Sequence, residues 1–310
     1  MNLYYAVKNK DDLIRQQSAS GGFFSIIAEY VLDKNGYVYG ATLSCGKVKH
    51  IRIDNVKDLE LLRGSKYVQS DLKDILRQVQ LDIRNETLVL FSGTPCQCAA
   101  VRSMIGNADN LILMDIVCHG VSSPKVFEEY WKMLEKNNGK IKKFNFRDKE
   151  YSWMQQQWSV EYIDNKKDAT SYEMKSYKEL YYKTILHRES CFECPFTSTE
   201  RKTDFTIGDF WGIEKFNKEI IDDNGVSLVI VHSDHAKEIW EQVSDNIFCW
   251  KAEEKDCLQP QLCHPTRQLY KDTNFWDDFC SRNSYEKVMK KYGWPSLSRR
   301  LKDKIKKIIK

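Results

Sequence analysis

Four cysteines stand at positions from which a folded chain could bring their thiols together. Cys96 follows the apolar run in LVLFSGTPCQ, and Cys118 follows the one in LILMDIVCHG. Cys191 and Cys194 form a Cys-x-x-Cys in the polar stretch SCFECPF. A spacing of three positions lets one short turn present two sulfurs to one ion, and four converging thiolates hold zinc or an iron–sulfur cluster. We therefore expect a metal or iron–sulfur site at these four positions.

The other cysteines of the chain are weaker candidates for ligands. A lone cysteine is usually a small buried hydrophobe, and this interpretation fits four of them: Cys45, Cys249, Cys257 and Cys280. Cys98 competes with Cys96 for a ligand role because it lies two residues further on. A helix that begins near Pro95 would point Cys98 elsewhere.

Alternating strands and helices must position these thiols. The apolar patterns predict strands at 37–44, 48–53, 87–91, 111–117, 144–147, 158–162 and 226–232. They predict helices at 23–32, 71–83, 96–104, 123–136, 177–187 and 234–243. This order indicates an α/β fold: a mixed, partly parallel sheet flanked by helices, followed by a less regular C-terminal half and a helical tail. Sites in such sheets gather at the carboxyl ends of the strands, where Cys96 and Cys118 are expected.

Composition favours a globular protein of a reducing compartment. The chain has 310 residues, of which 42% are hydrophobic and 30% charged, and a net charge of +4 that does not indicate nucleic-acid binding. The opening MNLYYAVKNKDDLIRQQ has no apolar signal core, and no apolar run is long enough to cross a bilayer. Ten cysteines are many for a cytoplasmic chain, where they serve as ligands or catalysts more often than as disulfides. We expect a cytoplasmic protein.

The C-terminal tail suggests a separate element. We expect a catalytic domain at 1–285 and a basic helical tail at 286–310, ending in SLSRRLKDKIKKIIK. Its apolar residues alternate with lysine and arginine, which is typical of a basic amphipathic helix. Such a helix suits peripheral contact with an anionic membrane surface, and it also suits docking on its own domain with a solvated basic face.

Seven short motifs together resemble a known family. They are, in chain order, SASGGFF, GSKYVQSD, FSGTPCQ, DIVCHGVSSP, FRDK, CFECPF and FTIGDFWG. Their order and spacing are similar to those of the coenzyme F420 hydrogenase/dehydrogenase beta-subunit family, from about Tyr4 to Gly212. The resemblance implies an oxidoreductase that contains FAD and iron–sulfur, and it assigns one 4Fe–4S cluster to the four cysteines. Relatives of this shorter kind also occur in surface-polysaccharide loci, which implies a small-molecule or glycan-precursor substrate.

One departure from the family concerns the source of electrons. Many relatives begin with a ferredoxin-like module that carries closely spaced cysteines, whereas this chain has none before Cys45. We therefore expect an external one-electron carrier, such as ferredoxin, to supply the electrons. A metabolite or glycan precursor is a more natural acceptor than coenzyme F420, which the motifs do not specify.

The glycine-rich motif before the first long helix could bind a phosphate. Ser18, Ser20, Gly21 and Gly22 offer hydroxyls and backbone amides at the positive end of that helix, which suits the pyrophosphate of FAD. The alternative is a simple helix cap with a glycine turn. An aspartate in place of Gly21 is expected to lower flavin occupancy without unfolding the domain.

Two further motifs fit a flavin. Ser65, Lys66 and Tyr67 combine a hydroxyl, a cation and an aromatic ring, which suit phosphate or the isoalloxazine, although a surface loop would look the same. Thr94 could hydrogen-bond the flavin or cap the helix that follows it.

His119 and Asp209 are the candidate catalytic residues. His119 follows Cys118 directly and could donate a proton beside the cluster, although such a histidine is more often structural. Asp209 in IGDFWG could orient a substrate or simply its own loop. The charged run Arg147–Lys149 fits either an acidic substrate or a solvated turn, and Arg201 and Lys202 could favour a reduced, more negative cluster.

Two rival functions remain open on the sequence alone. The four cysteines could form a structural zinc site in a binding or scaffold protein without redox activity. Cys96 and His119 could instead serve a transferase with a cysteine nucleophile. The colour of the purified protein distinguishes the expected oxidoreductase from the zinc protein, because a flavin and iron–sulfur protein is brown whereas a zinc protein is colourless.

Overall fold

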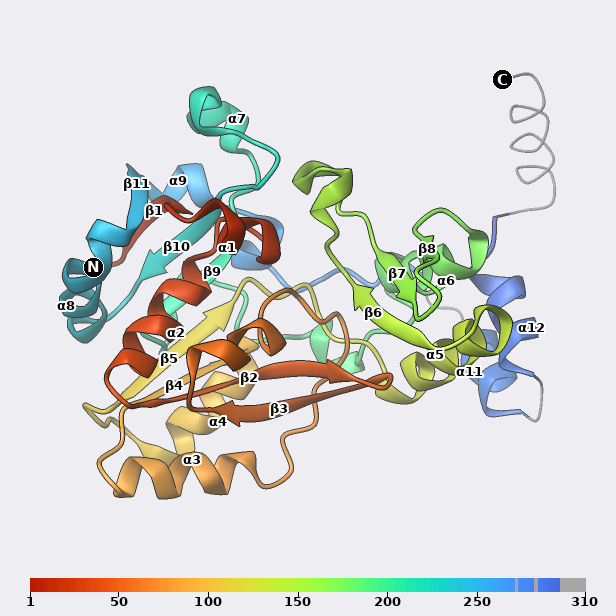
Figure 1. Cartoon of the computed structure of the whole chain (residues 1–310), viewed down its shortest axis with the longest axis horizontal. Helices are drawn as coiled ribbons and strands as arrows, with labels where there is room; N and C mark the ends of the chain where they lie inside the picture. The colour runs from red at the N-terminus through yellow and green to blue at the C-terminus, as the bar shows by residue number, and fades with distance from the viewer. Residues whose placement is uncertain (271–272, 282–283, 296–310) are drawn as a thin grey trace.

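The computed structural model describes residues 1–270, 273–281 and 284–295. Its largest feature is an eight-stranded sheet, and a second unit built on a three-stranded sheet lies beside it (Figure 1). The large sheet has the strand order β11-β1-β10-β9-β5-β4-β2-β3. Its middle strands β2, β4, β5 and β9 run parallel, whereas the strands toward both edges pair antiparallel. The mixed, partly parallel sheet flanked by helices is thereby confirmed.

The strands of the large sheet come from the whole length of the chain. They are β1 (Leu3–Asn9), β2 (Tyr37–Ser44), β3 (Lys47–Ile53), β4 (Val89–Gly93), β5 (Leu111–Ile116), β9 (Phe205–Asp209), β10 (Ser227–Val231) and β11 (Ile247–Ala252). Side chains alternate between the two faces, as the period of two requires. On β4 and β5, for example, Leu90 and Ile112 enter one core while Phe91 and Leu113 enter the other.

Helices cover both faces of this sheet. One face packs against α2 (Phe23–Asp33) and α8 (Asp234–Val243). The opposite face packs against two groups of helices: α3 (Ile75–Arg84) and α4 (Pro95–Ile105) at one end, and α7 (Ile213–Phe216), α9 (Glu254–Cys257) and α10 (Pro260–Cys263) at the other. The short helix α1 (Asp12–Gln17) links β1 to the loop before α2. Helices on both faces keep the middle strands β4 and β5 dry, which explains their continuous apolar runs.

The second unit has its own aromatic-rich core. Its sheet contains β6 (Ile141–Asn145), β7 (Ser159–Tyr162) and β8 (Lys167–Asp168). Four helices pack around it: α5 (Pro124–Asn138), α6 (Tyr172–Tyr182), α11 (Thr273–Cys280) and α12 (Tyr285–Tyr292). We call β6–β8 with these helices the second unit. Figure 1 shows it at the right of the large sheet.

Most elements lie where the sequence predicts them, and the differences are local. The helix predicted at 71–83 begins only at Ile75, and the one predicted at 177–187 is α6, Tyr172–Tyr182. The strand predicted at 144–147 is β6, Ile141–Asn145. Strands β9 and β11 are missing from the prediction. The five residues of β9, FTIGD, end on turn-forming types and carry little apolar pattern.

The expected boundary at residue 286 falls inside α12. Val288 and Met289 of this helix are buried in the core of the second unit. Residues 296–310 of the predicted basic tail, which carry its amphipathic pattern, lie outside the described residues. Among the residues that the structure does describe, no helix combines the length and the apolar character that a membrane span requires.

Candidate flavin and iron–sulfur site

A pocket of about 430 Å³ opens at the carboxyl ends of β4, β5 and β9, between the large sheet and the second unit. Its lining includes most of the binding and catalytic residues predicted from the sequence: Ser18, Ser20, Gly22, Ser65, Lys66, Tyr67, Thr94, Cys118, His119 and Asp209. These residues come from five of the seven motifs, up to 191 positions apart in the chain. The fold therefore gathers them into one site.

One wall of the pocket is the glycine loop, residues 18–22, with the start of α2. Gly22 is the N-cap residue of α2 and supplies no side-chain cap, and Phe23 and Phe24 line the pocket beside it. The first amides of a helix have no acceptor within the helix. The Ser25 amide donates to the Gly22 carbonyl oxygen at 3.2 Å, which leaves the Phe23 and Phe24 amides for an anionic group in the pocket, with the helix dipole favouring negative charge.

Gly21 differs from its neighbours in the glycine loop because it faces the sheet instead of the pocket. A Cβ built on Gly21 would collide with the carbonyl oxygen of Val7 and would lie 2.6 Å from the amide nitrogen of Ser227. Gly21 is also absent from the pocket lining. Its lack of a side chain lets the loop pack against β1 and β10. A substitution here would disturb that packing, so loss of flavin would not report on phosphate contact.

The cations of the pocket wall are already engaged with the protein. The Lys66 ammonium donates to the carbonyl oxygens of Leu62 at 2.9 Å and Arg63 at 2.8 Å, and burial lowers its pKa to about 7. The Arg63 guanidinium bonds Ser25 and Gln17. Neither cation is free to act as a simple phosphate clamp, which leaves the α2 amides as the main anion-binding feature of this wall.

Tyr67 and Thr94 both line the pocket, but different parts of the protein hold them in place. Tyr67 stacks on Trp158 with 5.4 Å between ring centroids, so its ring is held by the core of the second unit. Thr94 is the N-cap residue of α4, and its backbone amide donates to the side-chain carbonyl oxygen of Gln97 at 3.0 Å. The Thr94 hydroxyl lies 3.2 Å from the Cys96 sulfur. Thr94 thus shapes the helix start that carries Cys96, and it also lines the pocket.

The four predicted cysteine ligands come from three loops. Cys96 lies in the first turn of α4, Cys118 follows β5, and Cys191 ends the short 3₁₀ turn Glu189–Cys191, with Cys194 just beyond it. The residues after Cys118 pair with the residues before Cys191, through a bridge between Ser122 and His187 and a bond from the Arg188 amide to the Val121 carbonyl. This pairing brings the Cys-x-x-Cys to Cys118.

Gly120 makes that approach feasible. Its φ of +108° is a conformation that L side chains rarely adopt, and a Cβ there would collide with the His187 ring and lie 3.3 Å from the Cys191 Cβ. The Gly120 amide in turn donates to the Cys118 sulfur at 3.4 Å. The glycine in the CHG motif therefore serves close packing beside the thiols.

The pKa values of Cys118 and Cys191 reflect burial and the neighbouring thiols. Burial raises the pKa of Cys118 to about 12, and nearby Cys191, Cys96 and Cys194 raise it further against the opposing Gly120 bond. Burial also raises the pKa of Cys191, with Cys96 and Cys194 contributing. In their chemistry, four cysteine thiolates are the donors that an iron–sulfur cluster or zinc requires. Among the described residues, no group of three or more His, Cys, Asp or Glu side chains has the arrangement that holds a metal ion.

Cys98, the competing ligand, points away from this group. Its side chain is fully buried between α4 and the sheet, where its sulfur lies 3.6 Å from the Met114 carbonyl oxygen. Burial raises its pKa well above the ordinary value. The start of α4 at Pro95 explains the separation, since residues two apart on a helix lie on different faces.

His119 lies on the pocket wall between the cysteines and the second unit. Its Nδ1 is 2.7 Å from the Gln261 amide nitrogen, and its backbone carbonyl accepts from Thr266 and His187. With Gln261 donating to Nδ1, the neutral ring carries its proton on Nε2. Burial lowers the pKa of His119, which favours that neutral form.

Asp209 is held by two donors from the segment that joins β6 to β7. Its carboxylate pairs with the Arg147 guanidinium at 2.7 Å and accepts from the Trp153 indole nitrogen at 2.5 Å. Although burial alone would lower the pKa of Arg147, the Asp209 carboxylate raises it. Arg147 therefore forms neither the solvated turn nor the open acid-binding site that the sequence left as alternatives.

Several pocket residues were not predicted from the sequence. They share aromatic or amide side chains and belong to the second unit or to segments that cross toward it: Gln156, Tyr181, Tyr182, Trp211, Gln259 and Gln261. No local pattern marks them, because aromatic and amide residues are common in loops and cores. Only the aromatic richness of α6 could have drawn attention to that helix.

Arg201 also has a different role from the one expected. Its side chain is buried and pairs with Asp115 at 3.3 Å, so it is not a free cation beside the thiols. Burial raises the pKa of Asp115 to about 6, against the effect of Arg201. Lys202 remains on the surface next to this pair.

Comparison with known proteins gives this site a context. No curated protein matches the chain. A solved chain of the F420-reducing [NiFe] hydrogenase complex from Methanosarcina barkeri has the same fold, with a TM-score of 0.54 and 16% sequence identity over 81% of this chain and 82% of that one. The family model for the C terminus of the coenzyme F420 hydrogenase/dehydrogenase beta subunit matches residues 86–256, more than half of the chain. The matched segment contains all four cysteines, the FRDK run and Asp209, and on this basis the chain belongs to the coenzyme F420 hydrogenase/dehydrogenase beta-subunit family.

Proposed function

We propose that the chain is an oxidoreductase that uses FAD and one 4Fe–4S cluster to pass electrons between an external one-electron carrier and a substrate. Membership of the family supports the redox class. The observation that carries the cofactor assignment is the position of Cys118. This residue belongs to the group of four interacting thiols, and it also lines the pocket that contains the glycine loop. A flavin in this pocket would lie beside the cluster.

The residues proposed to hold FAD divide the pocket into two ends. The α2 amides at Phe23 and Phe24, with Ser18 and Ser20, form the phosphate end. The opposite end, near Cys118 and His119, would receive the isoalloxazine, with Ser65, Lys66, Tyr67 and Thr94 on the walls between. When bound, FAD supplies two-electron exchange with a substrate and one-electron exchange with a cluster.

Cys96, Cys118, Cys191 and Cys194 are proposed as the four ligands of the cluster. His119 is proposed as the proton donor, because its Nε2 carries the proton of the neutral ring and its side chain lines the pocket. Asp209 is proposed to orient the substrate end of the pocket through its bonds to Arg147 and Trp153. No step of this scheme requires coenzyme F420, and a small molecule or glycan precursor is proposed as the substrate.

Protein partners fit the proposed relay. The similar solved chain belongs to a hydrogenase complex of Methanosarcina barkeri. For this chain we propose a ferredoxin-like carrier, in a reducing compartment such as the cytoplasm, that docks near the cysteines. Surface cations such as Lys202 would steer an acidic carrier, so the rate of electron transfer should fall as salt rises.

Anaerobic purification followed by analysis of iron, sulfide, zinc and flavin tests the cofactors. The proposal expects a brown protein with about four irons and one FAD per chain. A colourless protein with one zinc and no flavin would instead support the structural zinc site. A protein that lacks both metal and flavin but loses activity on alkylation of Cys96 would support a cysteine nucleophile.

Stopped-flow absorbance tests the direction of the relay. Chemically reduced ferredoxin should bleach the flavin of the purified protein rapidly, and Lys202→Ala should weaken the salt dependence of that rate. Rapid bleaching by NADH, with no reaction toward any low-potential one-electron carrier, would replace the relay with a direct pyridine-nucleotide site.

A further inference from the structure

The FRDK run reaches from the second unit to both ends of the pocket. We call residues 147–149 the clamp segment. Arg147 pairs with Asp209 of the large sheet at 2.7 Å. We call the eight-stranded sheet, with its helices and loops, the large unit. The Lys149 ammonium donates to three backbone carbonyl oxygens of this unit: Arg15 at 2.6 Å, Ser20 at 2.7 Å and Asn224 at 2.5 Å.

Asp148 anchors the clamp segment in its own unit. Its backbone is extended, with φ of −84° and ψ of 105°, so its side chain points away from those of its neighbours. Its carboxylate accepts from the Ser159 hydroxyl on β7 and pairs with Lys167 on β8 at 2.7 Å. The clamp segment therefore has one side chain in the second unit and two in the large one.

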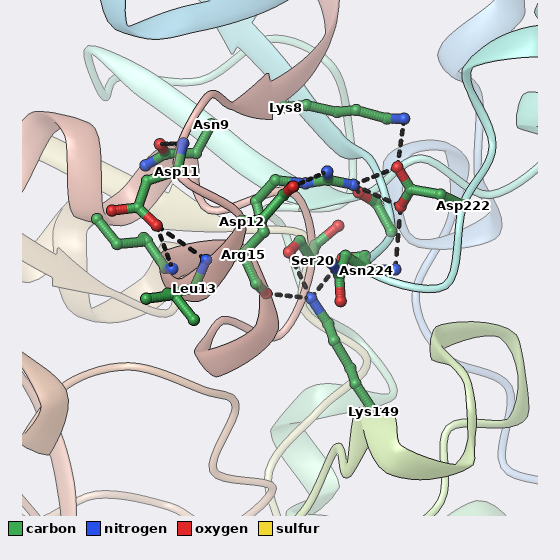
Figure 2. Close-up of polar contacts among 12 residues, drawn as sticks. Lys8, Asn9, Asp11, Asp12, Leu13, Arg15, Ser20, Lys149, Asp222 and Asn224 are labelled. Carbon is green, nitrogen blue, oxygen red and sulfur yellow. Dashed lines mark hydrogen bonds and ion pairs between the residues drawn. The ribbon is translucent and has the colours of Figure 1, made fainter.

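The three carbonyls that receive Lys149 are held in place by other contacts. The buried Arg15 guanidinium pairs with Asp222 and donates to the Gly225 carbonyl at 3.3 Å, which ties α1 to the turn before β10. Asp222 also pairs with Lys8 at 2.6 Å and accepts from the Asn224 amide at 3.0 Å (Figure 2). We call the carbonyl oxygens of Arg15, Ser20 and Asn224 the carbonyl cradle.

The chemistry of the carbonyl cradle matches an ammonium group. An ammonium has three donors and no acceptor, so it can satisfy three converging carbonyls at once. Figure 2 shows the Lys149 side chain extending from the second unit to this cradle, with one bond to the glycine loop at Ser20. Removing the ammonium would leave the three carbonyls without this partner, which is costly where water is excluded.

We infer that Lys149 is a positioning residue. Through the Ser20 carbonyl, it fixes the glycine loop to the second unit. The phosphate end of the pocket and the part of its wall around Asp209 thereby keep one relative geometry. Lys149 itself does not line the pocket, and it acts through the backbone of Ser20. That FAD is the ligand of this pocket rests on the proposed function. The tether, by which we mean the bond from Lys149 to the glycine loop at Ser20, does not.

Hydrogen exchange on the ligand-free protein tests the tether. In Lys149→Met, amides of residues 15–25 should exchange at least tenfold faster than in the wild type, while those of β4 and β5 should keep their rates. Lys142→Met is the matched control, because it removes a lysine of the second unit whose bonds, to Glu161 and Asn165, involve neither the clamp segment nor the large unit. It should leave residues 15–25 unchanged. Equal exchange of this segment in Lys149→Met and wild type would overturn the inference.

Ammonium ions test the chemistry of the carbonyl cradle. In Lys149→Ala, ammonium chloride should slow exchange of residues 15–25 toward the wild-type rate, because ammonium carries N–H donors of the same kind. Tetramethylammonium chloride at the same ionic strength has no such donor and should have no effect. Equal exchange in the two salts would overturn the role of the three carbonyls.

FAD titration followed by flavin fluorescence links the tether to the pocket. Lys149→Met should raise the FAD dissociation constant at least tenfold, and Lys142→Met should not. If the wild type itself fails to bind FAD, the proposed function fails while the exchange data still decide the tether. If the glycine loop loosens but FAD affinity stays unchanged, the positioning role toward the pocket is wrong.

Discussion

Arg147 and Asp209 form an ion pair in the wall of the pocket, with 2.7 Å between Nη1 and Oδ2, although they lie 62 positions apart in the chain. Their side chains are only 4% and 13% exposed. The pair joins the second unit to the end of β9, and the Trp153 indole bonds the same carboxylate. Because a buried charge without its partner is expensive, this contact should matter more than the surface ion pairs of the chain.

Breaking this pair should destabilise the protein. Asp209→Asn keeps an acceptor for Trp153 but leaves the Arg147 charge buried without its counterion, so the free energy of unfolding should fall by about 3 kcal/mol. Urea unfolding followed by tryptophan fluorescence measures it. Lys142→Met, in the exposed pair with Glu161, is the control and should cost less than about 1 kcal/mol. Similar losses in both variants would show that burial of the Arg147 pair adds nothing.

Gly21 should be intolerant of any side chain. Gly21→Ala places a Cβ against the backbone of β1 and β10, where nothing flexible can move aside, and should lower the free energy of unfolding by at least about 2 kcal/mol. Gly212→Ala is the control, since its φ of +87° is strained but its Cβ would meet open space. It should cost about 1 kcal/mol. Unfolding curves compare the two, and a smaller loss at Gly21 would contradict the packing account.

Iron content should distinguish the two neighbouring cysteines of α4. Cys96→Ala should lose the cluster, because it removes one of four proposed ligands. Cys98→Ala should keep the wild-type iron content and lose only about 1 kcal/mol of stability from its buried position. Iron per chain after anaerobic purification measures the outcome. Retained iron in Cys96→Ala together with lost iron in Cys98→Ala would exchange the two assignments.

Acid should destabilise the chain partly through His50. Burial lowers the pKa of this histidine to about 4, despite the bond from its ring to the Ser92 carbonyl, whereas the unfolded chain has a value near 6.5. The unfolded state therefore binds more protons between about pH 6.5 and 4, so stability is lost as pH falls through that window. His50→Gln removes this titration.

Unfolding curves between pH 7 and 4.5 measure the contribution of His50. The wild type should lose on the order of 2 kcal/mol more than His50→Gln over this range. His264→Gln, at an exposed histidine, is the matched control and should follow the wild type. Parallel curves for His50→Gln and wild type would mean that this histidine titrates alike in both states.

The amino-acid sequence by itself determined the local elements and the candidate ligands. The apolar runs before Cys96 and Cys118 predicted β4 and β5 because a continuous run of apolar residues is a property of near neighbours in the chain. Proline at the first position of α5 and the Cys-x-x-Cys spacing are also features that a few neighbouring residues define. The seven motifs also sufficed to recognise the family, which the family model confirms.

Only the tertiary structure decided which partners these residues meet. Sequence suggested a phosphate contact for Lys66 and Gly21, yet the Lys66 ammonium bonds nearby carbonyls and Gly21 packs against β1 and β10. The clamp segment fitted either an acidic-substrate site or a solvated turn, yet Lys149 enters a carbonyl cradle assembled from residues up to 134 positions away. Hydrogen bonds and ion pairs depend on atoms that converge from distant segments. Their geometry exists only after the large sheet and the second unit have come together, so no local pattern could have predicted it.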